Sequence, residues 1–315
     1  MILFADFFCG VGGLRLGFEN ASSDFKCVFS NDIDKNAIKT YELNFPSHKV
    51  NSTSISNLEC KDIPKFDLFL GGFPCQSFSI AGNRKGFDDE RGNLFFDIIR
   101  ILSYHKPKAI LLENVKNLQN HDNSNTFMVI KTELEKIGYF IQSKVLNTCK
   151  YANIPQNRER IFIVGFLDRN SFEKFKFPEE EKLKTNIIDL IDEKVDDTFY
   201  YSENSKIYSK LDLEITKKIK ENQLYQYRRH LVRENKSKVC PTLTANMGSG
   251  GHNVPLLRDL YGIRKLTPRE CFRFQGFPNN FKFPNISNCH LYKQAGNSVT
   301  VPLITKLAIE IKKVL

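Results

Sequence analysis

The stretch Gly71-Gly72-Phe73-Pro74-Cys75-Gln76-Ser77-Phe78-Ser79 directly follows an apolar run at residues 66–70. This pattern predicts a buried strand that ends in a loop shaped by glycine and proline, with Cys75 just past the strand end. In open α/β sheets, ligands and catalytic groups collect at the carboxyl ends of the strands. An isolated cysteine is more often a buried core residue. At a strand end, with Pro74 fixing the backbone before it, Cys75 is a candidate nucleophile.

The first half of the chain alternates short β-rich runs with helical patterns, which predicts an α/β fold built on a mostly parallel sheet. Strands are expected near residues 3–8, 27–29, 66–70, 108–112, 139–146 and 161–166, with helices near 14–18, 37–45, 94–102 and 127–137. The charged stretch at 172–184 predicts a domain edge. The amphipathic pattern at 299–315 predicts a helix that packs back on the first domain.

The composition is that of a globular protein. A chain of 315 residues with 41% hydrophobic and 26% charged residues can bury a full α/β core and carry one smaller domain. Because no apolar run is long enough to cross a bilayer and the first residues lack a basic leader, neither membrane insertion nor secretion is expected. Eight cysteines without a C-x-x-C pair argue against a disulfide framework and structural zinc. We therefore expect a cytoplasmic protein without a metal.

The positive charge is unevenly distributed. The net charge is +10, and between Ser205 and Glu270 fourteen basic residues stand against six acidic ones. A basic segment of this kind indicates a polyanionic partner and favours nucleic acid. A solvated basic face that aids solubility would produce the same composition.

Three further features lie at expected strand ends. The segment Asp6-Phe7-Phe8-Cys9-Gly10-Val11-Gly12-Gly13 predicts a tight strand-to-helix turn that a ligand can approach closely. It lacks the G-x-G-x-x-G pattern, which disfavours a dinucleotide. Asp32 closes the next strand, where a carboxylate can bind a nucleoside ribose or cap the following helix. Glu113 closes the strand expected at 108–112.

Cys75 and Glu113 have no neighbouring His in the sequence, unlike a cysteine protease, in which a base lies beside the thiol. The pair suits conjugate addition to an electron-poor ring, in which the thiolate adds to a ring carbon and the carboxyl hydrogen-bonds a ring nitrogen. The apolar residues before Glu113 would help to keep that carboxyl protonated. Arg158 and Arg160, two residues apart before an expected strand, are expected to face the same side and engage a phosphate or carbonyl oxygen, or to pair with Glu159.

Taken in order, these motifs resemble those of the bacterial-type DNA (cytosine-5) methyltransferases over nearly the whole chain. The matching segments are the turn at residues 6–13, Phe73-Pro74-Cys75-Gln76, Arg91-Gly92-Asn93-Leu94-Phe95, Glu113-Asn114-Val115, Gln156-Asn157-Arg158-Glu159-Arg160, Arg264-Lys265-Leu266-Thr267-Pro268-Arg269-Glu270-Cys271 and Tyr292-Lys293-Gln294-Ala295-Gly296-Asn297-Ser298-Val299. Seven matches in the family's order leave little room for chance.

The resemblance implies a class I S-adenosylmethionine-dependent methyltransferase, with a Rossmann-like, mostly parallel sheet flanked by helices and a smaller target-recognition domain. It implies that Cys75 attacks C6 of a cytosine flipped out of double-stranded DNA. Glu113 would bind ring N3 and the amino group, and Arg158 and Arg160 would support the ring oxygen and the adduct. Carbon C5 would then take the methyl group, and loss of its proton would release Cys75. A restriction-modification role and a monomer are expected from the family.

The resemblance also implies two sets of binding residues. The S-adenosylmethionine site would comprise Phe8, Gly10, Val11, Gly12, Asp32, Ile33, Ile55, Pro74, Leu94, Asn297 and Ser298. DNA contacts would come from Ser79, Arg84, Lys85, Arg228, Arg229 and Thr242. The expected domains are a catalytic and cofactor-binding domain at 1–180, a target-recognition domain at 181–285 and a returning segment at 286–315.

One position departs from the family's pattern. Relatives often carry an acid before Ile in the third motif, which contacts the adenine amino group, whereas this chain has Ser54 before Ile55. A serine hydroxyl can still accept a hydrogen bond, so the resemblance implies a weaker adenine contact and a preserved pocket.

Three alternatives differ in testable ways. Some relatives methylate tRNA by the same chemistry, but the Gly-Phe-Pro-Cys sequence and the long basic segment favour DNA. A zinc cytosine deaminase needs H-x-E and P-C-x-x-C, and this chain lacks the second Cys after Pro74-Cys75. A non-catalytic DNA-binding module would not need Cys75, Glu113 or Arg158.

Overall fold

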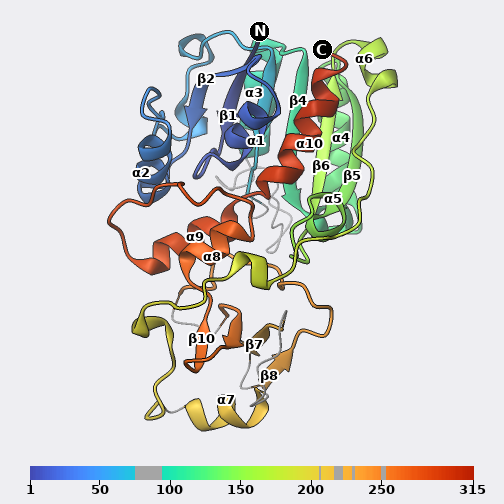
Figure 1. Cartoon of the computed structure of the whole chain (residues 1–315). Helices are drawn as coiled ribbons and strands as arrows, with labels where there is room; N and C mark the ends of the chain where they lie inside the picture. The colour runs from blue at the N-terminus through green and yellow to red at the C-terminus, as the bar shows by residue number, and fades with distance from the viewer. Residues whose placement is uncertain (75–93, 206, 216–222, 229–230, 250–252) are drawn as a thin grey trace. The chain divides into compact units, whose positions relative to one another are not determined.

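The computed structural model describes residues 1–74, 94–205, 207–215, 223–228, 231–249 and 253–315. These residues form two compact units (Figure 1). The first comprises residues 1–146, 159–179 and 303–315, and the second comprises 147–158 and 180–302.

The first unit contains a six-stranded sheet in the order β2-β1-β3-β4-β6-β5. Its strands are β1 (Ile2–Phe7), β2 (Phe25–Asn31), β3 (Leu68–Gly71), β4 (Ala109–Val115), β5 (Phe140–Asn147) and β6 (Glu159–Phe166). The β1–β2, β1–β3 and β3–β4 pairs are parallel, and β6 runs antiparallel to β4. The predicted α/β fold with a mostly parallel sheet is confirmed.

Helices cover both faces of this sheet (Figure 1). They are α1 (Gly13–Ala21), α2 (Lys35–Asn44), α3 (Leu94–His105), α4 (Asn125–Lys136), α6 (Arg169–Lys174) and α10 (Val301–Lys312). The first two residues of α10 belong to the second unit, and its remainder belongs to the first. Strand alternation in β1 directs Phe4 toward Phe18 of α1 and directs Ala5 and Phe7 into the apolar core shared with α3 and α4. Asp6 therefore points to the same face as Phe4.

The strand order reverses next to β1, since β2 lies on one side of it and β3 on the other. Ligands of open α/β sheets bind at such a switch point, outside the carboxyl ends of the strands. The parallel strands β1, β2, β3 and β4 all end at this edge. Because β6 is antiparallel, its beginning lies at the same edge, where Arg160 is paired with Val115.

The second unit contains a four-stranded sheet in the order β10-β9-β7-β8. Its elements are α5 (Thr148–Tyr151), α7 (Tyr208–Glu214), β7 (Tyr225–Arg228), β8 (Leu231–Glu234), β9 (Leu256–Arg258), β10 (Ile263–Lys265), α8 (Pro268–Arg273) and α9 (Asn288–Asn297). Apolar side chains of α7 and the sheet form its small core. Arg264, fully buried, forms ion pairs with Asp259 at 2.7 Å and Glu270 at 2.9 Å.

The compact units differ from the expected boundaries at two places. Residues 147–158 belong to the second unit because their backbone bonds to it, with Asn157 N donating to Cys240 O at 2.8 Å and Cys240 N donating to Pro155 O at 2.6 Å. Of the segment expected to return, only residues 303–315 join the first unit, where Gly17 of α1 packs tightly against Ile304.

Candidate functional site

The glycine-rich turn after β1 is built from left-handed backbone. Phe8, Gly10 and Gly12 have φ values of 53°, 54° and 87°. A non-glycine residue in this region is strained, and such strain concentrates at functional sites. A Cβ on Gly10 would meet nothing within 4 Å, whereas a Cβ on Gly12 would lie 2.4 Å from the Phe45 ring. Gly10 thus leaves open space for a ligand, and Gly12 allows close packing against α2.

The end of β2 holds this turn in place. Asp32 accepts hydrogen bonds from Gly10 N at 2.7 Å and from Asp34 N at 2.8 Å, and burial raises the pKa of its carboxyl. The capping residue of α2 is Asp34, not Asp32. Ile33 is 67% exposed, although it is a large apolar side chain. The pair therefore presents a carboxylate and an apolar surface beside the open space at Gly10.

Asn31 is a residue that the sequence reasoning missed. Its side-chain amide donates to Asn51 O at 2.8 Å and to Thr53 O at 2.7 Å. These bonds position the segment that leads to Ser54 and to the buried Ile55. An Asn directly before an acid at a strand end was the available signal, because short amides there often bind neighbouring backbone.

Asp6 lies fully buried beneath the turn. Neither carboxyl oxygen has a hydrogen-bond partner among the described residues. The backbone amide of Arg15 nevertheless lies near enough to lower the pKa of Asp6, against the effect of burial. Burial raises the pKa of Asp6 to about 8, and the Arg15 guanidinium opposes the shift. Burial also raises the pKa of the nearby Cys9 thiol, and the charge of Asp6 raises it further. The carboxyl is thus protonated below about pH 8.

We expect Asp6→Asn to remove a pH dependence from the stability of the protein. The folded state holds the Asp6 proton up to about pH 8, whereas an unfolded Asp releases it near its ordinary value, so folding takes up a proton in between. Between these two pKa values, the free energy of unfolding of the wild type should fall as the pH rises, by at most about 1.4 kcal/mol per pH unit relative to the variant. Urea unfolding of both proteins at pH 5, 6, 7 and 8 measures the difference. A difference that stays constant with pH would contradict the assignment.

Glu113 lies within β4, which continues two residues beyond the expected end, to Val115. Arg160, at the start of β6, places its Nε 3.1 Å from Glu113 Oε1, and both side chains are nearly buried. Burial lowers the pKa of the Arg160 guanidinium, while Glu113 acts in the opposite direction. The structure therefore brings these two predicted residues together in a largely desolvated ion pair.

The backbone that leads to Cys75 passes beside this pair. A Cβ on Gly72 would lie 3.5 Å from Glu113 Oε2, and Asn114 Nδ2 donates to Phe73 O at 3.0 Å. Asn114 is a second residue whose part the sequence reasoning missed. The hydrogen bond from Asn114 anchors the chain two residues before Cys75, and the distance at Gly72 shows that the backbone there lies close to Glu113.

Arg158 has different partners from Arg160. Its guanidinium is buried in the second unit and donates to three backbone carbonyls, those of Leu243, Gly296 and Ser298. The two arginines thus have different partners, and Arg158 directly precedes β6, so strand alternation does not apply to it. The alternative, a salt bridge between these arginines and Glu159, is not among the ion pairs of the described residues, in which Glu159 pairs with Lys116 at 3.0 Å.

The remaining predicted residues are placed as follows. Val11 is buried, Leu94 begins α3 and Pro74 is exposed. In the second unit, Asn297 is exposed at the end of α9 and Ser298 is buried. Arg228 is exposed at the end of β7, and the Thr242 hydroxyl donates to Asn157 O at 2.6 Å. Cys75, Ser79, Arg84, Lys85 and Arg229 lie outside the described residues.

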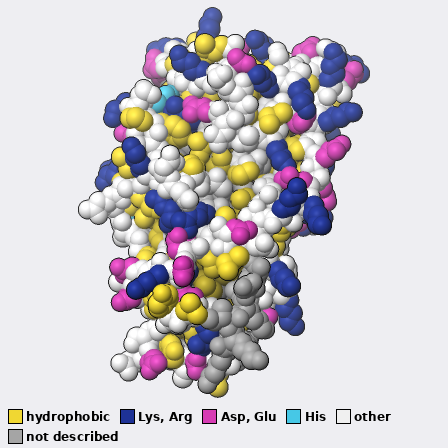
Figure 2. Space-filling view, viewed as in Figure 1, with side chains coloured by type: hydrophobic (Ala, Val, Ile, Leu, Met, Phe, Trp, Pro, Cys, Tyr) yellow, Lys and Arg dark blue, Asp and Glu magenta, His cyan; other side chains and the backbone are white. Residues whose placement is uncertain are grey.

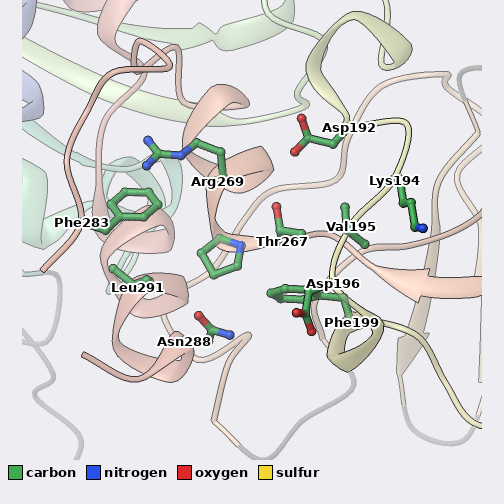
Figure 3. A pocket seen from close by; sticks show the side chains of 11 residues that line it. Asp192, Lys194, Val195, Asp196, Phe199, Thr267, Arg269, Phe283, Asn288 and Leu291 are labelled. Atoms are coloured by element: carbon green, nitrogen blue, oxygen red, sulfur yellow. The ribbon is translucent and has the colours of Figure 1, made fainter. Parts of the chain in front are cut away.

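The second unit also contains a surface pocket of about 310 Å³ (Figure 3). Arg269, stacked 3.8 Å above the Phe283 ring, lies on one side, and Asp192 and Asp196 come from the segment opposite. None of the predicted site residues lines it. Two carboxylates and two basic side chains, Lys194 and Arg269, line it, so its charge favours neither an anion nor a cation.

Neither the surface charge visible in Figure 2 nor the arrangement of metal-binding side chains among the described residues marks a further site. On the face shown in Figure 2, Lys and Arg side chains are spread out with Asp and Glu between them. Among the described residues, no group of His, Cys, Asp and Glu is arranged to hold a metal ion. In the same part of the chain, no helix is both long and apolar enough to span a membrane.

Comparison with known proteins extends over nearly the whole chain. A family model for C-5 cytosine-specific DNA methylase matches residues 2–313. The type II methyltransferase M.Bsp6I of Bacillus sp. (strain RFL6) is 53% identical over 317 residues, covering 99% of each chain. The type II methyltransferase M.DsaV of Dactylococcopsis salina is 40% identical over 315 residues, covering 97% of this chain and 84% of that protein. The solved structure of the Entamoeba histolytica methyltransferase EhMeth has the same fold, with a TM-score of 0.78 at 22% identity, and covers 99% of this chain and 98% of its own.

Proposed function

Since the chain belongs to the C-5 cytosine-specific DNA methylases and is a DNA cytosine-5 methyltransferase, we propose which of its residues carry out the reaction. The Cys75 thiolate adds to C6 of a cytosine extruded from the duplex. Glu113 hydrogen-bonds ring N3 and the amino group, and Arg160 binds the ring oxygen. The observation that carries this proposal is the Glu113–Arg160 pair beside the backbone that leads to Cys75.

The Glu113–Arg160 pair suits this chemistry because charge changes on the ring during addition. Adding a thiolate at C6 pushes electron density toward N3 and C5. Glu113, a carboxylate paired with Arg160 in the structure, must take up a proton from solvent when the base binds in order to act here. Shared with N3, that proton takes up part of the charge, and the Arg160 guanidinium takes up more at the ring oxygen. Both side chains are nearly buried, so these interactions act in a low dielectric and are already oriented.

We propose S-adenosylmethionine as the methyl donor, which supplies a methyl group activated by a sulfonium. The residues at the end of β1 and β2 fit such a molecule. Gly10 leaves open space, Asp32 offers a carboxylate to ribose hydroxyls, and the exposed Ile33 offers an apolar surface to a purine. Asn297 and Ser298 of the second unit are proposed as further cofactor contacts.

We expect Ser54→Ala to weaken S-adenosylmethionine binding by less than tenfold, about 1.4 kcal/mol. The substitution removes one hydroxyl, while the backbone is held independently by Asn31 and by Asn57 N, which donates to Ser54 O at 2.8 Å. Isothermal titration of both proteins with S-adenosylhomocysteine tests this. A larger loss would mean that the serine carries most of the adenine contact.

The wider role follows from the relatives. We propose that the chain is the modification enzyme of a restriction-modification system. It acts as a cytoplasmic monomer on a short sequence of double-stranded DNA. Arg228, Arg229 and Thr242 are proposed to contact that DNA. The type II methyltransferases M.Bsp6I and M.DsaV, matched over 99% and 84% of their lengths, support this role.

Bisulfite sequencing tests the function directly. Mixed-sequence plasmid DNA is incubated with the protein with and without S-adenosylmethionine. Protected cytosines confined to one short motif, and only with the cofactor, would establish DNA methylation and identify the recognition sequence. If no cytosine is protected in any context, the proposal fails, and tRNA becomes the substrate to test.

A further inference from the structure

We propose that Arg158 is a positioning residue that fastens the segment 243–248 to the end of helix α9, and that this fastening couples DNA binding to cofactor binding. The coupling presupposes the function proposed above, because Thr242 is taken to contact DNA and Asn297 and Ser298 to contact the cofactor. Arg158 would then act on both ligands without touching either.

The contact is made by one guanidinium and three carbonyls, which we call the Arg158 clasp. Nη1 of Arg158 donates to Leu243 O at 2.8 Å, and Nη2 donates to Gly296 O at 3.0 Å and Ser298 O at 2.6 Å. The side chain is only 2% exposed. Hydrogen bonds from a charged donor are among the strongest in proteins, and the planar guanidinium fixes their directions.

The backbone of segment 243–248 also lies directly against α9. A Cβ on Gly296 would lie 2.2 Å from the carbonyl carbon of Thr244 and 2.5 Å from Ala245 N. A Cβ on Gly248 would lie 2.8 Å from Tyr292 Cβ. The two stretches of chain therefore touch at both ends of the segment, and glycine makes each approach possible.

Two buried amides fasten the same two stretches to a common frame. Gln156 accepts from Leu243 N at 3.2 Å and donates to Phe274 O at 2.6 Å. Gln275 donates to Ala295 O at 2.7 Å. Gln156 also donates to Gln275 Oε1 at 3.2 Å, so the amides are joined to each other. A shift of either stretch would break several buried hydrogen bonds at once.

The proposed ligand contacts lie at the edges of the clasp. Thr242 directly precedes Leu243. The exposed Asn297, the last residue of α9, lies between Gly296 and Ser298, whose carbonyls Arg158 binds. DNA that holds Thr242 would thereby also restrict Asn297 and Ser298, and a bound cofactor would restrict Thr242. Such coupling is reciprocal, because it is one free energy shared by two binding equilibria.

Arg158→Lys tests the coupling. Lysine keeps the charge but cannot bind three carbonyls with a planar fork. The probes are S-adenosylhomocysteine and a duplex oligonucleotide carrying the motif found by bisulfite sequencing. In the wild type the duplex should lower the Kd of S-adenosylhomocysteine about tenfold, within the usual range for coupled sites. In Arg158→Lys we expect the duplex to lower this Kd by less than about threefold, even if the affinity for each ligand alone also changes.

Arg264→Lys is the matched control, since Arg264 is also a buried arginine of the second unit but pairs with Asp259 and Glu270. It should lower the melting temperature and keep the coupling factor of the wild type. Equal factors in the wild type and Arg158→Lys, or no coupling in the wild type, would overturn the inference. Failure of the proposed function is seen separately, as a lack of protected cytosines.

A second variant keeps the inference testable if Arg158→Lys does not fold. Gly296→Ala leaves Arg158 in place but forces Thr244 and Ala245 away from α9. We expect it to lower the coupling factor in the same way. A Gly296→Ala protein that is folded and retains the wild-type factor would show that the contact does not couple the two ligands.

Discussion

Cys75→Ala is expected to abolish methyl transfer, with a loss of about 10⁴-fold or more in single-turnover rate. Without the thiolate, C6 receives no nucleophile, and C5 never becomes electron-rich enough to take a methyl group. Gly72 lies close to Glu113, and the Phe73 carbonyl is held by the Asn114 amide, so this backbone has contacts that the substitution leaves in place. DNA affinity should therefore stay within about threefold of the wild-type value.

The bond that Cys75 forms can be observed directly. In a duplex with 5-fluorocytosine at the methylated position, the adduct has no C5 proton to lose and cannot release the thiol. The wild type should form a complex with this duplex, in the presence of S-adenosylmethionine, that survives denaturing electrophoresis. Cys75→Ala should not form it. Methylation by the folded alanine variant at a rate near that of the wild type would exclude Cys75 as the nucleophile.

The sheet and much of the candidate site could be predicted because their signals are local. The apolar run before Cys75 predicted β3, and the observed strand, Leu68–Gly71, overlaps it. The glycine pattern after β1 predicted a tight turn, and the structure has one there, with open space beside Gly10. Strand ends could be predicted less well. Glu113 was expected to end its strand, and β4 continues two residues further because pairing with β6 extends it to Val115.

What local patterns could not predict depends on partners far away in the sequence. The burial of Arg158 comes from carbonyls 85 to 140 residues later in the chain. The place of residues 147–158 in the second unit likewise comes from backbone bonds to Cys240 and from side-chain bonds to Phe274. A spacing of two predicts a shared face only within a strand, and Arg158 lies outside one.

Glu113→Gln is expected to lower the single-turnover rate by about 10²- to 10³-fold and to destabilise the protein as well. The amide keeps the shape of the side chain and can still hydrogen-bond the ring, but it cannot share a proton with N3 in the same way. It also leaves the Arg160 guanidinium nearly buried without its carboxylate. Burial already lowers the pKa of Arg160, so loss of the compensating charge should cost stability.

Glu159→Gln is the matched control for this prediction. Glu159 is next to Arg160 in β6, but it pairs with the exposed Lys116 at 3.0 Å, and both partners are about half exposed. An exposed pair contributes little, so this variant should melt within about 1 °C of the wild type and retain its rate. Combining Glu113→Gln with Arg160→Gln should restore part of the lost stability, because the double variant no longer buries an unpaired charge. Rate losses of the same size in Glu113→Gln and Glu159→Gln would contradict a specific contact between Glu113 and the base. A rate loss in Glu113→Gln without any loss of stability would show instead that Arg160 does not depend on Glu113 for its charge balance.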